Sequence, residues 1–304
     1  MDDTLCGKFG VLRTYLPDEL GKNGTLDFDD NKDLTQYCPE KDSGGNECND
    51  NLDKITAGFL WLLEQCYRAL KHKTHGTNSV NAFYIYIISW FSYKLKQIEG
   101  EEFTTINKFY TKNIKDSGKY KKFIREAYTV GELKEFMDER TDLMNINIED
   151  LSKFYDAFKL ICSVYGNVAQ NQISDTLSND ATSFVDKYIE LNNNHNIEDI
   201  ARSKILPVLL TDYDNLKNSC TKKGANCKDL LFLPDITTKM SALSSRDTSS
   251  SSIGKRLFTV LSIFGVIAFF LGISYKYSLF GFRKRAQKQK LKEKIKNIKK
   301  RMNH

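Results

Sequence analysis

The cysteines are the residues of this sequence whose chemistry is most readily named, because paired thiols form disulfides. There are seven, all in the first 227 of 304 residues: Cys6, Cys38, Cys48, Cys66, Cys162, Cys220 and Cys227. This density is typical of a domain that folds in an oxidising compartment. The odd count leaves at least one thiol unpaired or available to another chain.

Two of the cysteine pairs bracket short loops rich in turn-forming residues. Cys38 and Cys48 flank PEKDSGGNE, and Cys220 and Cys227 flank TKKGAN. We therefore predict one short disulfide loop at each pair. Spacing alone does not assign partners to the other three cysteines.

A zinc site is the rival interpretation for part of this chemistry. Cys66, His72 and His75 lie near one another in sequence, but no fourth ligand follows at a zinc-like spacing and there is no CxxC motif. The chain also lacks GxGxxG, GxxxxGK[ST], GxSxG and HExxH motifs. We therefore expect no catalytic residues, no cofactor and no metal, and a membrane-anchored enzyme is the least favoured function.

Apolar residues at helical spacing predict the elements that must position these cysteines. The expected helices cover residues 52–70, 82–98, 104–114, 120–128, 129–144, 148–165, 174–191 and 197–220, with a kink at Pro207. Residues 1–36 show a mixed pattern with an acidic loop. No series of short strands is indicated, so we expect an all-α domain over residues 1–240.

An uncharged run of 19 residues, LFTVLSIFGVIAFFLGISY, extends from Leu257 to Tyr275. As a helix it would be about 28 Å long, which matches the hydrocarbon core of a bilayer. We predict a single transmembrane helix over 257–275, extending to 282 if the aromatic residues that follow are included. Its partner is the lipid bilayer, and a Ser-rich linker over 241–256 would join it to the helical domain. A buried core helix is the alternative.

The charge of the chain is divided unevenly about this run. Residues 276–304 hold 12 Lys or Arg and one acid, including the cluster Arg283, Lys284 and Arg285, whereas the rest of the chain has 33 basic and 38 acidic residues. The positive-inside rule places this tail in the cytoplasm and residues 1–255 across the membrane. A tail-anchored protein with residues 1–255 in the cytosol is the alternative. The start MDDTLCGKFGVLRTYL does not resemble a signal peptide, so we expect the span itself to direct targeting.

The basic tail also carries an apolar row at helical spacing. Leu291, Ile295, Ile298 and Met302 would lie on one face of a helix. Such a helix suits an anionic lipid surface or an acidic cytoskeletal protein, and a solvated tail is the simpler interpretation. Because the rest of the chain is mildly acidic, we expect no nucleic-acid partner.

Several segments resemble one known family when taken in order. They are YCP at 37–39, NLDKITAGFLWL at 51–62, ISWFSYKL at 88–95, KFYDAFKLIC at 153–162 and LGISYKYSLFGFRKR at 271–285. Together they resemble the Plasmodium interspersed repeat family of malaria parasites, in its rodent-malaria form, over essentially the whole chain.

The resemblance implies a helical, disulfide-containing ectodomain with no enzymatic activity. It implies a variant antigen of a multigene family, exported to the membrane of the infected red cell, with a role in antigenic variation and an unidentified host ligand. The alternative is an internal linker between membrane and skeleton that acts through the basic tail. The family implies no binding residue that can be assigned here, and the partner of Cys162 stays open.

Overall fold

The computed structural model describes residues 1–22, 24–72, 75–100, 103–121, 123–125, 132–169 and 175–222, together with Ile236 and Met240. Residues 1–239 belong to one compact unit. The expected linker, the span from Leu257 to Tyr275 and the tail with Arg283, Lys284 and Arg285 lie outside the described residues. Within the described part, no helix is both long and apolar enough to cross a bilayer.

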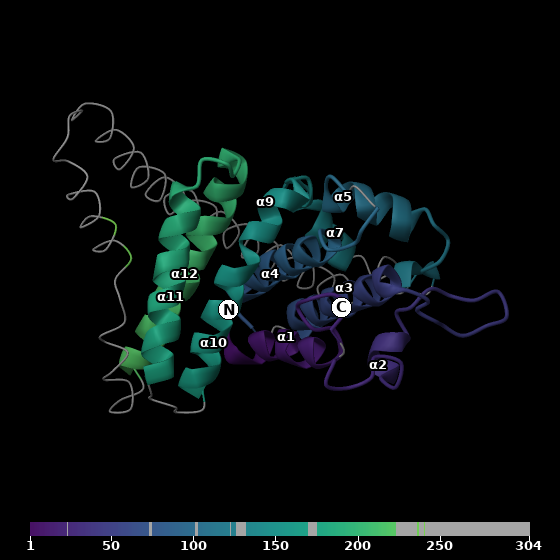
Figure 1. Cartoon of the computed structure of the whole chain (residues 1–304), viewed down its shortest axis with the longest axis horizontal. Helices are drawn as coiled ribbons and strands as arrows, with labels where there is room; N and C mark the ends of the chain where they lie inside the picture. The colour runs from purple at the N-terminus through teal and green to yellow at the C-terminus, as the bar shows by residue number, and fades with distance from the viewer. Residues whose placement is uncertain are drawn as a thin grey trace, which may run out of the picture. The chain divides into compact units, whose positions relative to one another are not determined.

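The described residues form helices and no β-strands, as the sequence predicted. The helices are α1 (Asp3–Tyr15), α2 (Lys32–Thr35), α3 (Asn51–His72), α4 (Thr77–Leu95), α5 (Ile106–Phe109), the π-helix η1 (Tyr110–Lys115), α7 (Glu132–Asp138), α8 (Thr141–Met144), α9 (Ile148–Lys153), α10 (Tyr155–Ala169), α11 (Asp175–Asn193) and α12 (Asp199–Lys222). Figure 1 shows α10, α11 and α12 side by side, with α4 running behind α9.

Helix α4 lies at the centre of the core. It is apolar on nearly every face, and Ile87, Ile88, Trp90 and Phe91 are all 0% exposed. A soluble-domain helix with such a sequence must be covered on all sides. Helices α3, α9, α10 and α12 supply that cover. The expected helix at 82–98 is therefore confirmed, although it begins and ends a few residues earlier.

A glycine lets α3 approach both α1 and α4. A Cβ added to Gly58 would lie 3.0 Å from a methyl carbon of Leu16, 3.1 Å from the ring of Trp90 and 3.2 Å from a methyl carbon of Leu12. These separations are shorter than ordinary van der Waals contacts, so only glycine fits without movement of its neighbours. The glycine in the segment AGFLWL of α3 is thus required by close packing against α1 and α4.

Helix α1 is absent from the sequence expectation, which assigned residues 1–36 a mixed pattern. The structure gives α1 13 residues, and the side chain of Asp2 caps it by accepting a hydrogen bond from the Leu5 N–H at 3.0 Å. Aspartate is a preferred N-cap because it accepts a bond that the helix itself cannot supply. The buried face of α1 includes Leu5, Phe9 and Leu12.

Two helices that the sequence predicted as continuous are broken. The expected helix at 148–165 is divided into α9 and α10 at Phe154, whose N–H bonds to the Leu151 carbonyl at 3.2 Å, one residue closer than in an α-helix. The expected helix at 129–144 is likewise divided into α7 and α8, and its first three residues are not described. At 106–115, α5 continues directly as the π-helix η1.

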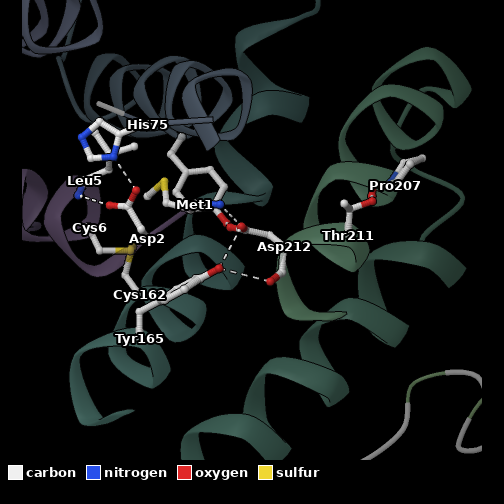
Figure 2. Close-up of polar contacts among 11 residues, drawn as sticks. Met1, Asp2, Leu5, Cys6, His75, Cys162, Tyr165, Pro207, Thr211 and Asp212 are labelled. Atoms are coloured by element: carbon white, nitrogen blue, oxygen red, sulfur yellow. Dashed lines mark hydrogen bonds and ion pairs between the residues drawn. A yellow bond between two sulfur atoms is a disulfide. The ribbon is translucent and has the colours of Figure 1, made fainter. Parts of the chain in front are cut away.

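Helix α12 extends through Pro207. The Thr211 hydroxyl donates a hydrogen bond to the Pro207 carbonyl at 2.7 Å (Figure 2). Proline lacks the N–H that would bond to the Ser203 carbonyl, and α12 continues without that bond. The helix therefore carries Asp212 onto the side of the core that faces α4 and α10.

Candidate functional site

The short loop between Cys38 and Cys48 is closed by a disulfide, with Cα atoms 5.0 Å apart. Gly44 and Gly45 at its tip have φ of +89° and +84°, a region that favours glycine. The Asn46 side-chain amide donates to the Cys38 carbonyl at 2.7 Å, so the loop is also held by a hydrogen bond.

A second disulfide joins Cys6 of α1 to Cys162 of α10, with Cα atoms 5.3 Å apart (Figure 2). The two cysteines are separated by 156 residues. This bond answers the question of the partner of Cys162, which the sequence left open. It fixes the first helix of the chain against the helix that carries Tyr165.

The remaining cysteines are placed differently. Cys66 is a free thiol buried in α3, and burial raises its pKa to about 12, so it stays protonated and unreactive at neutral pH. The backbone of Cys220 belongs to α12, but its side chain and all of Cys227 lie outside the described residues. That predicted pairing therefore stays a prediction.

The two histidines of the zinc interpretation do not converge on Cys66. His72 is exposed at the end of α3, and the Nδ1 atom of His75 lies 2.5 Å from a carboxylate oxygen of Asp2 (Figure 2). Across the described ranges, no three His, Cys, Asp or Glu side chains gather as a metal site would require. His75 instead holds the residue that caps α1.

A buried polar cluster surrounds Asp212, which is 2% exposed. The Tyr86 hydroxyl donates to its Oδ2 at 2.6 Å, and the Tyr165 hydroxyl donates to its Oδ1 at 3.0 Å. The Met1 amine donates to the same Oδ1 (Figure 2). The cluster thus joins α4, α10, α12 and the residue that precedes α1. We define Met1, Tyr86, Tyr165 and Asp212 as the Asp212 cluster.

The electrostatics of the Asp212 cluster are dominated by burial. Burial raises the pKa of the Tyr86 and Tyr165 hydroxyls, so both remain hydrogen-bond donors across the physiological range. Burial lowers the pKa of the Met1 amine to about 5, against the opposing charge of Asp2. A neutral amine still donates to the Asp212 carboxylate. The cluster is buried, and its hydrogen bonds hold α4, α10 and α12 together.

Sequence reasoning missed the Asp212 cluster, although one signal was present. Asp212 follows the apolar run ILPVLL with only Thr211 between them. A charged side chain beside such a run is buried only when it is hydrogen-bonded, so the neighbours of a buried Asp212 carboxylate had to include hydrogen-bond donors.

A small hollow lies beside the Cys6–Cys162 bond. It is lined by Phe9, Arg13, Tyr86, Tyr155, Phe158, Lys159 and Cys162. The enclosed part of this hollow has room for about one water molecule. The hollow therefore does not accommodate a cofactor.

Comparisons with known proteins identify relatives of this fold. A family model described as Plasmodium variant antigen protein Cir/Yir/Bir matches residues 6–276. A solved structure of a Plasmodium PIR protein ectodomain is similar with a TM-score of 0.53 and 31% sequence identity, covering 72% of this chain and 93% of that chain. No curated protein matches.

The family model spans most of the chain, and the solved ectodomain shares the helical fold at an identity that supports common descent. The range matched by the family model also includes the uncharged run at 257–275. The chain belongs to the Plasmodium Cir/Yir/Bir family of variant antigen proteins.

Proposed function

We propose that this protein is a single-pass surface antigen of the infected red cell, with residues 1–240 outside and residues 276–304 in the cytoplasm. The helical ectodomain is non-catalytic and varies among family members for immune evasion. It also presents a surface to a host ligand. Leu257–Tyr275 is the membrane anchor.

The observation that carries this proposal is membership of a variant antigen family, combined with a domain cross-linked by two disulfides. Disulfides of this kind form in oxidising compartments and on cell surfaces. The uneven distribution of basic residues supports the orientation, because positively charged segments stay on the cytoplasmic side.

Protease treatment of intact infected cells tests the orientation. An antibody against the ectodomain should lose its epitope after treatment, while an antibody against residues 276–304 should retain its own until the membrane is permeabilised. A membrane-impermeant thiol reagent applied after reduction should reach the ectodomain cysteines in the same cells. An ectodomain that stays protected from both the protease and the impermeant thiol reagent refutes the proposal.

A second function rests on the 12 basic residues of the tail. These charges would let an internal protein connect a membrane to an acidic skeletal partner. Deletion of residues 276–304 separates the two functions. Altered cell mechanics with no surface exposure before the deletion would favour the internal linker.

A further inference from the structure

Exposed lysines are concentrated in one part of the domain. Five of them lie between residues 108 and 121: Lys108, Lys112, Lys115, Lys119 and Lys121. Asp116 is the one acidic residue within that interval. This local excess of positive charge stands out because residues 1–275 as a whole are mildly acidic.

Three of these lysines lie on the solvent-exposed side of one continuous helical segment. Helix α5 and the π-helix η1 are continuous, and their inner face carries Ile106, Phe109, Tyr110 and Ile114, each at most 4% exposed. Lys108, Lys112 and Lys115 are all exposed, so their side chains lie on the solvent side of this continuous helical segment. We call these three residues the lysine strip.

Within the described residues, the lysine strip forms no ion pair. Several other basic side chains in the described part have acidic partners, for example Lys54 with Asp29 at 3.0 Å and Lys96 with Glu149 at 2.8 Å. No described carboxylate pairs with a residue of the strip. Lys119 interacts electrostatically with Asp53 and is therefore left out of the strip.

The surroundings of the strip discriminate among anionic partners. Tyr110, Tyr120 and Phe123 are buried, and the half-buried ring of Phe103 packs edge-on against Phe109. Among the described residues near the strip, no aromatic ring is therefore fully exposed for stacking of nucleic-acid bases. The large apolar side chains that are exposed in the described residues are Val11, Leu26 and Ile200, and none of them lies near the strip in sequence. Insertion of the strip into a lipid surface has no apolar support there.

We propose that the lysine strip binds a linear sulfated polysaccharide. Lysine ammonium groups are mobile point charges, which suit sulfate and carboxylate groups distributed along a flexible chain, whereas planar bidentate recognition calls for arginine. The inference rests on the proposed function only in that the ectodomain must face host surfaces. The interaction itself belongs to the folded domain and is measured with purified protein.

Lysine footprinting of the full-length chain in neutral detergent tests the site directly, with a heparin oligosaccharide as the probe. Heparin should protect Lys108, Lys112 and Lys115 from acetylation, as mapped by mass spectrometry, and should leave exposed lysines elsewhere reactive. Because the measurement resolves single residues, binding of heparin to the basic tail does not obscure it. Protection confined to residues 276–304 overturns the proposal.

Matched variants test the energetic contribution. Lys108→Gln/Lys112→Gln/Lys115→Gln should reduce the slope of log affinity against log salt for heparin by about 2–3, since each lost lysine contact releases about one counterion fewer. The control Lys22→Gln/Lys32→Gln/Lys71→Gln removes the same charge from other exposed positions and should leave the slope unchanged. Circular dichroism should show equal helicity in both variants.

Three outcomes overturn the proposal. The first is an equal reduction of the salt slope for heparin in the two variants. The second and third are protection of the strip from acetylation by phosphatidylserine vesicles, or by an oligonucleotide, without protection by heparin. The failure of surface display is distinguishable from these, because protease treatment of cells reports display and the purified chain reports binding. A chain that binds heparin through the strip but is never cleaved on intact cells contradicts only the proposed orientation.

Discussion

Removal of each disulfide should destabilise the domain by an amount set by the loop that the bond closes. A cross-link restricts the unfolded chain, and the restriction grows with loop length. Separations of 156 residues for Cys6–Cys162 and 10 residues for Cys38–Cys48 give about 5 and about 3 kcal/mol at 25 °C by the chain-entropy relation. Loss of the longer bond should therefore reduce the free energy of unfolding by about 2 kcal/mol more than loss of the shorter one.

The assay compares Cys6→Ala/Cys162→Ala with Cys38→Ala/Cys48→Ala in the full chain, by thermal and urea unfolding. At roughly 2–4 °C per kcal/mol for a domain of this size, the first variant should melt about 10–20 °C lower than the native chain and the second about 6–12 °C lower. Each variant serves as the other's control. Equal losses, or a larger loss for Cys38→Ala/Cys48→Ala, refute the reasoning, because native contacts within the short loop would then outweigh chain entropy.

Three further predictions follow from packing and burial. Gly58→Ala should lower the free energy of unfolding by about 1–3 kcal/mol through overpacking, whereas Gly7→Ala, which meets no atom within 4 Å in α1, should be neutral or stabilising; similar urea midpoints would contradict this. Burial lowers the pKa of Lys94 from 10.5 to about 8. Between these two pH values the unfolded chain binds a proton that the native chain has lost, so the free energy of unfolding should increase as the pH rises through this range. Lys94→Met should lack that gain when the two proteins are unfolded at pH 7.5 and 9.5, and parallel curves would exclude the assignment. Cys66 should resist iodoacetamide in the native state and react only after unfolding, as peptide mapping would reveal; labelling of the folded protein would disprove its burial.

The long helices were predictable because their apolar residues cover many turns. The pattern at 52–70 located α3 to within two residues at its C-terminal end, and the apolar segment at 82–98 located α4. The break at Phe154 left no such signal, since a single tight turn keeps the apolar stripe on one side of both α9 and α10. Helix α1 was missed because its Gly7 and Gly10 weaken the apolar pattern, although Asp2 offered an N-cap.

The candidate site was less accessible from sequence than the helices. The Cys38–Cys48 pairing was suggested by a short loop that contains Gly44 and Gly45, so local geometry was sufficient. The Cys6–Cys162 bond depends on how α1 packs against α10, which spacing cannot report. The same holds for the Asp212 cluster, because its hydroxyl donors come from helices distant in sequence.

The Cys6–Cys162 bond closes a covalent ring that includes most of the helical domain. A protease that cuts the backbone once anywhere between these two residues leaves both fragments attached to each other. Such a nicked molecule migrates as intact protein on a non-reducing gel and separates only when dithiothreitol is added. In the protease test of the proposed surface display, a single cleavage is therefore detected only in the reduced sample, and a gel run without reductant would be read as showing a protected domain.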